Sequence, residues 1–229
     1  MTTTSQLDLV HLHNRAPAPA RSVADARTSL LTRTEELSLA LSRLCRAAAH
    51  LDEAAEAIVA CLLAGGRVLV AGNGGSAAEA QHFATELVGR FLRERAPYAV
   101  ISLTADTAIL TAVANDYGYD QVFARQVRAY GRSGDVFVGF STSGKSPNVV
   151  EAAKAARDLG VRVIVMTGER VSPLANLAEI PIRVPATDTP LIQELHTVVL
   201  HVLCDLVERA LVASELTAEI AQDRAVAVR

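Results

Sequence analysis

Short runs of β-branched and aliphatic residues alternate with helical stretches through the middle of the chain, and this alternation constrains the fold more than any other feature. Five such runs are predicted to be strands: Arg67–Ala71, Tyr98–Leu103, Asp135–Phe140, Val161–Met166 and Ile180–Val184. Helices are predicted between them: Ala77–Leu92, Thr107–Ala114, Asp120–Tyr130, Pro147–Leu159 and a short one near Leu174–Ala178. Strands that alternate with helices pair in parallel through right-handed crossovers. The sequence therefore predicts an α/β fold with a doubly wound, five-stranded parallel sheet flanked by helices.

The segments on either side of this region are predicted to be helical. Leucines at helical spacing fill residues 22–64, and Gly65–Gly66 marks their end, which predicts an N-terminal helical hairpin whose second helix begins at Asp52. A long apolar helix is predicted from about Pro190 to Ala213. The expected organisation has four parts: a flexible tail (1–21), N-terminal helices that provide oligomer contacts (22–64), an α/β domain (65–215) and a C-terminal tail (216–229).

Charge and hydropathy exclude several classes of protein. The net charge is −3 and lysines and arginines form no concentrated stripe, so nucleic acid is not an expected partner. No apolar stretch approaches the roughly 18–20 residues of a membrane span, and Met1–Pro19 lacks the apolar region of a signal peptide. The three cysteines, Cys45, Cys61 and Cys204, have no CxxC spacing and are expected to be buried, reduced thiols. A cytoplasmic protein is predicted.

Two loops that follow predicted strands carry the residues of a binding site. In Gly72–Ser76 the glycines let the backbone approach a ligand, and Ser76 is expected to cap the next helix, although an ordinary tight turn explains this loop nearly as well. The second loop has four hydroxyls and a glycine before Pro147, which stands at the first helical position. These hydroxyls belong to Ser141, Thr142, Ser143 and Ser146. Since one serine would suffice for a cap, four hydroxyls at a helix N-terminus favour a phosphate cradle.

The second loop also matches a nucleotide-binding pattern. Gly139–Ser146 reads GFSTSGKS, which satisfies GxxxxGK[ST] after a strand. A nucleotide triphosphatase also needs an acidic residue at the end of a later strand to hold Mg²⁺. The two later strands run into Thr167 and Pro185 instead. We interpret the match as coincidental.

Two helices carry a cluster of possible acid–base or metal-binding residues. His82 and Glu86 are four residues apart and share a helical face. On the terminal helix, Gln193, His196 and His201 fall near one another by helical phase. Two histidines, a glutamate and a glutamine oxygen are acceptable ligands for a divalent metal such as zinc, and the glutamate and a histidine equally suit general acid–base catalysis. We interpret His196 as a satisfied core residue.

Four sequence segments together resemble the phosphoheptose isomerase branch of the SIS (sugar isomerase) family, over about residues 54–210. They read AGNGGSAAEAQHFATELVGRF at 71–91, LTAVANDYGYDQVFARQV at 110–127, FSTSGKSPNVV at 140–150 and IQELHTVVLHVLCDLVE at 192–208. The resemblance implies the SIS fold and a ketose-to-aldose conversion of sedoheptulose 7-phosphate, or a close homologue, through an enediol. It also implies a zinc cofactor and a homotetramer with sites at subunit interfaces.

The resemblance assigns roles to individual positions. Phosphate binding falls on Ser141, Thr142, Ser143 and Ser146, and the sugar contacts on Asn73, Gly74, Gly75, Ser76, Asn115, Asp116 and Gln193. The implied metal ligands are His82, Glu86, Gln193 and His201, and the implied acid–base pair is Glu86 and His201.

The sequence departs from the family pattern at three places, one beside the phosphate loop and two at the mouth of the predicted site. Lys145 replaces the usual asparagine, Val171–Ser172 replaces a glycine pair, and Leu191 replaces an arginine. Two alternatives share the fold: a non-enzymatic protein that binds the replication initiator, and a sugar-phosphate-binding regulator. The first lacks the residues that match Glu86 and His201, and the second normally has a fused helix-turn-helix domain. Both comparisons favour an enzyme.

Overall fold

The computed structural model describes residues 25–227, so the predicted tail over residues 1–21 lies outside the described part of the chain. Two compact units divide the chain between Glu35 and Glu36. The first unit contributes only the beginning of helix α1, which spans Ala26–Leu44. The second unit, from Glu36 onward, contains the sheet and all the candidate site residues.

The sheet has five parallel strands in the order β2-β1-β3-β4-β5. The strands are β1 (Val68–Ala71), β2 (Val100–Ser102), β3 (Val136–Ser141), β4 (Arg162–Thr167) and β5 (Ile180–Arg183). Each overlaps its predicted run; the central strands β1, β3 and β4 are almost entirely buried, as their aliphatic sequences predict, and the edge strands β2 and β5 are partly exposed. Ala71 lies opposite Gly139, and Ser141 lies opposite Thr167, so the carboxyl ends line up at one edge. The strand order reverses between β1 and β3, and at such a switch point open α/β sheets bind their ligands.

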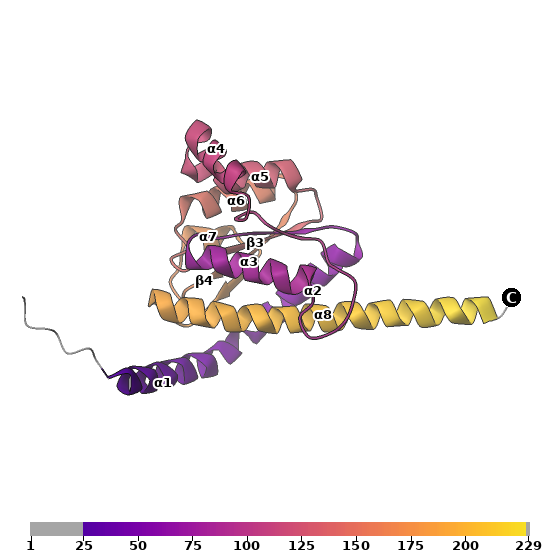
Figure 1. Ribbon diagram of the computed structural model, residues 1–229, viewed down its shortest axis with the longest axis horizontal. Helices are drawn as coiled ribbons and strands as arrows, with labels where there is room; N and C mark the ends of the chain where they lie inside the picture. Colours follow the sequence, from indigo (N-terminus) through magenta and orange to yellow (C-terminus); the bar gives the residue numbers. More distant parts are fainter. Residues whose placement is uncertain (1–24, 228–229) are drawn as a thin grey trace, which may run out of the picture. The chain divides into compact units, whose positions relative to one another are not determined.

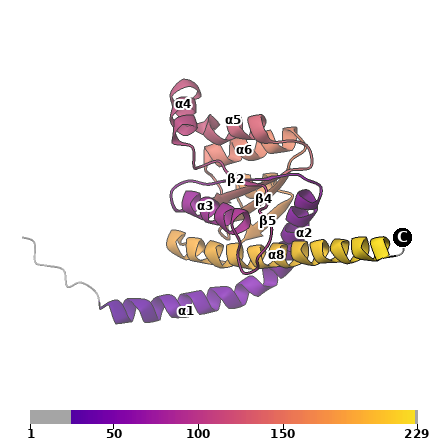
Figure 2. The same cartoon turned by 45° about the vertical axis from the view of Figure 1, so that its right-hand side comes forward.

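Helices cover both faces of the sheet (Figures 1 and 2). Besides α1 they are α2 (Ala48–Leu63), α3 (Gly75–Val88), α4 (Thr107–Tyr117), α5 (Val122–Tyr130), α6 (Pro147–Asp158), α7 (Pro173–Leu177) and α8 (Thr189–Ala227). One buried apolar cluster joins the sheet to α2, α3 and α8, and a second joins it to α5, α6 and α7. Helices α3 and α8, which carry the predicted acid–base residues, therefore pack on the same face.

Several predicted helix boundaries were wrong. Helix α3 ends at Val88 rather than Leu92, and α4 continues to Tyr117 rather than ending at Ala114. The second helix of the hairpin begins at Ala48 rather than Asp52, after a 3₁₀ turn over Cys45–Ala47. The chain stays in the right-handed helical region through this turn, since the alanine-rich sequence contains no helix breaker. Helix α8 continues to Ala227 instead of ending near Ala213, because residues 214–227 also lack glycine and proline. Most of the predicted C-terminal tail is thus helical.

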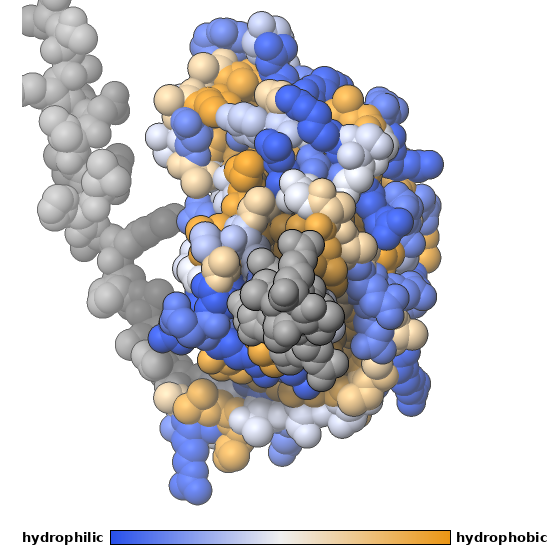
Figure 3. All heavy atoms as spheres, turned by 90° about the vertical axis from the view of Figure 1, so that its right-hand side faces the viewer, coloured by the Kyte–Doolittle hydropathy of each residue, from blue (hydrophilic) through white to orange (hydrophobic). Residues whose placement is uncertain are grey.

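Helix α8 exposes apolar side chains in its described part. In Figure 3, hydrophobic residues lie among hydrophilic ones on the side of the molecule that faces right in Figure 1. On α8, Val202 is 43% exposed and Leu216 is 56% exposed. Between residues 25 and 227, no helix combines the length and apolar character that crossing a bilayer requires.

Candidate active site at the carboxyl edge of the sheet

The loop between β3 and α6 forms the predicted phosphate cradle. Ser146 is the N-cap of α6 and Pro147 occupies its first turn, as the sequence predicts. The Ser141 and Ser146 hydroxyls lie 2.9 Å apart, and Ser141 Oγ also accepts from the Gly144 amide at 3.1 Å. Thr142 is half-buried and Ser143 is exposed, so their hydroxyls are accessible just before the amino end of α6. This arrangement suits an anion with several oxygens.

Gly144 lets this loop close against the loop after β4. Its φ is +62°, and a side-chain carbon there would lie 2.5 Å from the Cβ of Ser172, so no larger residue fits. Ser172 is buried and caps α7, and the Leu174 amide donates to the Gly144 carbonyl at 3.1 Å. Ser172, one of the departures from the family pattern, therefore forms part of the wall of the cradle.

The loop between β1 and α3 is tied to the cradle by an amide pair. Asn73 and Asn148 each donate to the other's side-chain oxygen at 2.8 Å, and the Tyr119 hydroxyl donates to Asn73 at 3.0 Å. Asn148 is 1% exposed and lies in the first turn of α6. The sequence prediction missed Asn148, although its position next to Pro147 was a usable signal. The expectation that Ser76 caps α3 was wrong, because the N-cap is Gly74.

His82, Glu86 and His201 converge at the interface of α3 and α8. His82 Nε2 lies 3.0 Å from Glu86 Oε1 and 3.3 Å from His201 Nε2. The His201 ring meets His82 edge-on at 5.0 Å and stacks on Phe91 at 5.5 Å between centroids. All three polar side chains are partly exposed, so a ligand can reach them. Phe91 was not among the predicted site residues.

These three residues fit a divalent metal. One nitrogen or oxygen of each lies within 4.8 Å of the others. Zinc holds such atoms at about 2.0–2.2 Å in tetrahedral geometry, which separates neighbouring ligand atoms by about 3.3–3.6 Å. In addition, His82 Nε2 faces two other polar atoms but carries at most one hydrogen. A cation at the centre of the cluster would give the polar atoms of all three side chains a partner.

The other predicted sugar-binding residues lie apart from this cluster. Gln193 is on α8, and its amide packs directly against Gly75, at the start of α3. Gln193 and His201 are eight residues apart, so their backbones are about 12 Å apart along the axis of α8. The Gln193 amide would therefore have to turn away from Gly75 and toward His201 to join the metal ligands. Asn115 and Asp116 are exposed in the last turn of α4, where the Asn115 amide donates to Asp116 at 2.8 Å.

His196 is a core residue, but it is not satisfied as expected. It is fully buried, and neither ring nitrogen has a hydrogen-bond partner. The nearest charged group is Glu79 on α3, whose Oε2 lies 3.5 Å from His196 Nδ1. The expectation that all three cysteines are buried was also wrong, since Cys45 is exposed.

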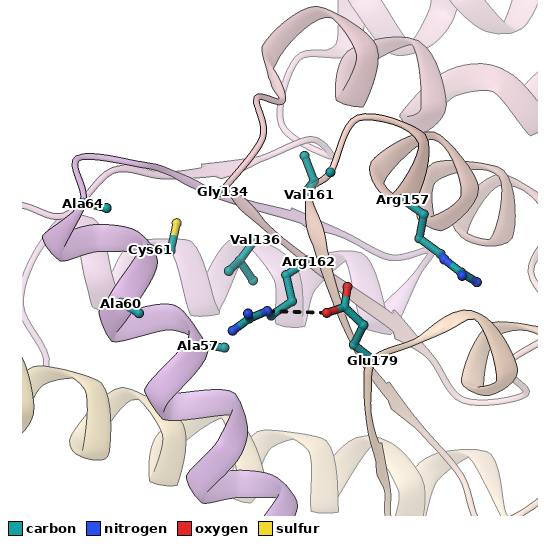
Figure 4. A pocket seen from close by; sticks show the side chains of 11 residues that line it. Ala57, Ala60, Cys61, Ala64, Gly134, Val136, Arg157, Val161, Arg162 and Glu179 are labelled. Carbon is teal, nitrogen blue, oxygen red and sulfur yellow. Dashed lines mark ion pairs between the residues drawn. The ribbon is translucent and has the colours of Figure 1, made fainter.

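A cavity of about 280 Å³ adjoins the phosphate cradle. Thr142, Ser143 and Lys145 line one side, and Arg170 and Thr187 line the other. A larger hollow of about 440 Å³ lies at the opposite, amino-terminal edge of the strands (Figure 4). Its carboxylate, on Glu179, pairs with Arg162 at 3.5 Å. The lining of that hollow contains one carboxylate and no histidine, whereas the carboxyl edge has a carboxylate close to two histidines. The carboxyl edge is therefore the better candidate for an active site.

The nucleotide-binding alternative fits the structure poorly. Gly139, Phe140 and Ser141 of the GFSTSGKS pattern lie inside β3 and are buried, so they cannot wrap a triphosphate. Lys145 precedes the N-cap and is exposed at the mouth of the cavity. Strand β4 ends at Thr167 and β5 at Arg183, neither of which is a Mg²⁺ ligand of that site.

Comparison with known proteins identifies the family. The profile of the SIS domain matches residues 34–168. A phosphoheptose isomerase from Rhodospirillum rubrum is 54% identical over 169 residues, which is 74% of this chain and 90% of that protein. Two solved structures are similar over 81% of this chain. The phosphoheptose isomerase GmhA from Neisseria gonorrhoeae has a TM-score of 0.76 at 40% identity and is covered in full. The phosphoheptose isomerase from Francisella tularensis has a TM-score of 0.77 at 39% identity and is covered over 99%.

The fold and the sequence comparisons agree with each other. The profile covers more than half of the chain, and the five-stranded parallel sheet is shared with the solved relatives. The chain belongs to the phosphoheptose isomerase branch of the SIS domain family.

Proposed function

We propose that the protein isomerises sedoheptulose 7-phosphate to D-glycero-D-manno-heptose 7-phosphate, or acts on a close seven- or eight-carbon homologue, through an enediol intermediate. The observation that carries this proposal is the cluster of His82, Glu86 and His201, in which a carboxylate and two imidazoles lie within 4.8 Å of one another. The names of the Rhodospirillum and Neisseria relatives support the substrate. A protein that only binds the replication initiator, or only senses a sugar phosphate, would not need this cluster.

The phosphate group would bind in the cradle after β3. Ser141, Thr142, Ser143 and Ser146 supply hydroxyls, and the amino end of α6 supplies a favourable dipole. Binding energy from the phosphate would fix the position of the distant reacting carbons. The sugar hydroxyls would contact the loop Asn73–Ser76, together with Asn115, Asp116 and Gln193.

Glu86 and His201 would move the protons. Conversion of a ketose to an aldose removes a proton from C1, returns one to C2 and transfers a proton between their oxygens. A carboxylate and an imidazole in reach of one another can divide these tasks as general base and general acid. His82, hydrogen-bonded to Glu86 at 3.0 Å, would orient the carboxylate.

Zinc is the proposed cofactor. His82, Glu86 and His201 would hold it, with Gln193 as a fourth ligand if its amide turns away from Gly75. Bound zinc would act as a Lewis acid that orients the sugar hydroxyls or stabilises developing negative charge.

A homotetramer with active sites at subunit interfaces is the proposed assembly. Support comes from leucines that the described part of the second unit exposes: Leu39 (66%), Leu63 (56%), Leu92 (62%) and Leu216 (56%). The helices of residues 22–64 would supply contacts. The three unpaired cysteines fit the proposed cytoplasmic location.

Incubation with a panel of ketose phosphates, with aldose formation followed by NMR, tests the proposal. Glu86→Gln keeps the size of the side chain and removes the base, so kcat should fall by about 10²–10⁴-fold. His201→Ala should have an effect of similar size. Glu179→Gln, at an exposed carboxylate by the opposite edge of the sheet, is the matched control and should retain the wild-type rate.

Two results would count against the enzyme. No turnover of any ketose phosphate, combined with a rise in melting temperature on adding sugar phosphate, would favour a binding protein. Wild-type rates in both Glu86→Gln and His201→Ala would show that the active site has been assigned to the wrong residues.

A further inference from the structure

Glu208, on α8, is a buried carboxylate with an unusual number of donors. Its side chain has no exposed surface, yet it accepts from the amides of Phe91 (2.9 Å), Leu92 (2.9 Å) and Arg93 (3.0 Å). It also accepts from Arg95 Nε at 3.2 Å and from the Arg93 guanidinium at 3.3 Å. A buried charge is tolerated only when it is well paired, and these five donors satisfy both carboxylate oxygens.

The donors all come from the connection between α3 and β2, which has no regular structure from Gly89 to Ala99. Backbone amides in such a segment lack the partners that a helix or sheet provides, so they must be satisfied by water or by side chains. Glu208 accepts from three in succession, and it comes from a helix more than 110 residues later in the sequence. The path of this connection therefore depends on one carboxylate.

Arg95 extends the same contact to the end of α3. Its guanidinium group is 1% exposed and donates to the carbonyl oxygens of Glu86 (2.9 Å), Gly89 (3.1 Å) and Ala96 (3.0 Å). Carbonyl groups in the last turn of a helix have no hydrogen-bond donor within the helix. Arg95 provides the donor for the carbonyl of Glu86. The Glu208–Arg95 pair thus holds the turn of α3 that carries the proposed base.

The connection also supports the proposed acid. Phe91 donates its amide to Glu208 and places its ring parallel to that of His201, with 19° between the planes. The other ring in contact with His201 is that of His82, which it meets edge-on. The χ2 torsion of a histidine has no narrow preferred value. If Phe91 moved, the His201 imidazole would lose its stacking partner and could rotate about χ2.

From these contacts we infer that Glu208 is a positioning residue for both members of the acid–base pair: it holds Phe91 against His201 and, through Arg95, the backbone of Glu86. The inference rests on the proposed isomerase function. Glu208 does not touch the cluster itself and acts only through these two neighbours. Partners that orient the residues of a site typically affect activity by about 10–100-fold.

Kinetics and NMR of Glu208→Gln test the inference. The neutral amide is close in size but presents a single oxygen and two hydrogens to five donors, so kcat should fall by about 10–100-fold. KM should change much less, because the phosphate cradle lies on other elements. With histidines labelled at ¹³Cε1, the His201 signal of the wild type should carry the ring-current shift of Phe91. Glu208→Gln should lose this shift, and so should Phe91→Leu.

Asp205→Asn is the matched control. Asp205 is one turn away on α8 and pairs with Arg93 at 2.9 Å, but no backbone amide of the 89–99 connection is among its donors. Its loss should leave kcat and the His201 signal as in the wild type. If Glu208→Gln does not fold, Arg95→Lys takes its place: a single ammonium group cannot reproduce the guanidinium contacts to Glu208 and to the carbonyl oxygens of Glu86, Gly89 and Ala96, so kcat should fall while the charge is kept.

Three outcomes would overturn the inference. Glu208→Gln could keep the wild-type kcat, it could lose kcat while the His201 signal stays in place, or Asp205→Asn could show the same losses. The NMR comparison needs no substrate. Failure of the wild type to isomerise any ketose phosphate would therefore refute the proposed function, while the His201 signal would still report whether Glu208 positions it.

Discussion

Replacement of Gly75 by alanine should reduce turnover with almost no effect on stability. A side-chain carbon at Gly75 would lie 2.7 Å from Gln193 Cδ and 3.0 Å from its Oε1. Carbon atoms in ordinary contact are about 3.5–4.0 Å apart, so the Gln193 amide would have to move by roughly 1 Å. The amide is the end of a flexible side chain, and alanine suits a helix better than glycine does by at most about 1 kcal/mol. The melting temperature should therefore change little.

Activity should respond much more strongly, because the Gln193 amide, in its position against Gly75, is a proposed contact of the sugar. A displacement of about 1 Å in a positioning group can reduce the rate by about 10²-fold. We expect a loss of this order in kcat/KM for the ketose phosphate, measured by the NMR assay. Thermal unfolding of the same preparations would verify that the fold is retained.

A double-mutant cycle with Gln193→Ala separates the clash from other effects of the substitution. If displacement of the amide is the cause, Gly75→Ala should have little further effect once Gln193 has been shortened. Additive losses in the double variant would refute this reasoning, as would a wild-type rate in Gly75→Ala alone.

Three further outcomes follow from buried groups. Asp135 accepts hydrogen bonds from the backbone amides of Arg67 (2.9 Å) and Arg132 (2.8 Å). Asp135→Ala should therefore lower the free energy of unfolding, measured in urea, by about 1–3 kcal/mol and leave kcat unchanged. An unchanged midpoint of urea unfolding would contradict this prediction. A thiol reagent at pH 8 should modify Cys45 quickly and the other two cysteines slowly. Burial, aided by the charge of Asp135, raises the pKa of Cys61 to about 11, and burial also raises the pKa of Cys204; two fast thiols would contradict it. Burial acts to raise the pKa of Glu208, but the amides of Leu92, Phe91 and Arg93 and the charge of Arg95 outweigh it and place that pKa below the ordinary 4.5. The stability that Glu208 contributes is therefore complete above about pH 4.5 and is lost as the pH falls through the lower, folded-state pKa. The difference in the free energy of unfolding between wild type and Glu208→Gln, measured in urea, should become smaller below pH 4. A difference that becomes larger below pH 4 would contradict a lowered pKa of Glu208 in the folded protein.

The sequence predicted those parts of the fold and site that depend on local patterns. Each strand lies within two residues of its predicted bounds because a buried parallel strand is a continuous aliphatic run. The cradle after β3 was predictable for a similar reason, since a cap, a proline and several hydroxyls stand in consecutive positions. His82 and Glu86 could be paired from their spacing alone, and the structure joins His201 to them.

Residues whose role depends on distant backbone could not be predicted in this way. Glu208 reads as an ordinary charged residue of a helix, and only the folded chain brings it to the amides of the 89–99 connection. Phe91 reads as the end of an apolar pattern, and its stacking on His201 follows from the same connection. His196 illustrates the opposite error: its apolar neighbours predicted burial correctly but gave no information on hydrogen bonding.

The phosphate cradle and the acid–base cluster differ in how much chain must be in place to form them. The Ser141–Ser146 contact that closes the cradle spans five residues, whereas the His82–His201 contact spans 119. Closing a long loop is slower and entropically more costly than closing a short one, so the two parts of the site should mature at different times. During refolding, the capacity to bind inorganic phosphate should return before the capacity to turn over a sugar phosphate, with the docking of α8 on α3 as the step between them.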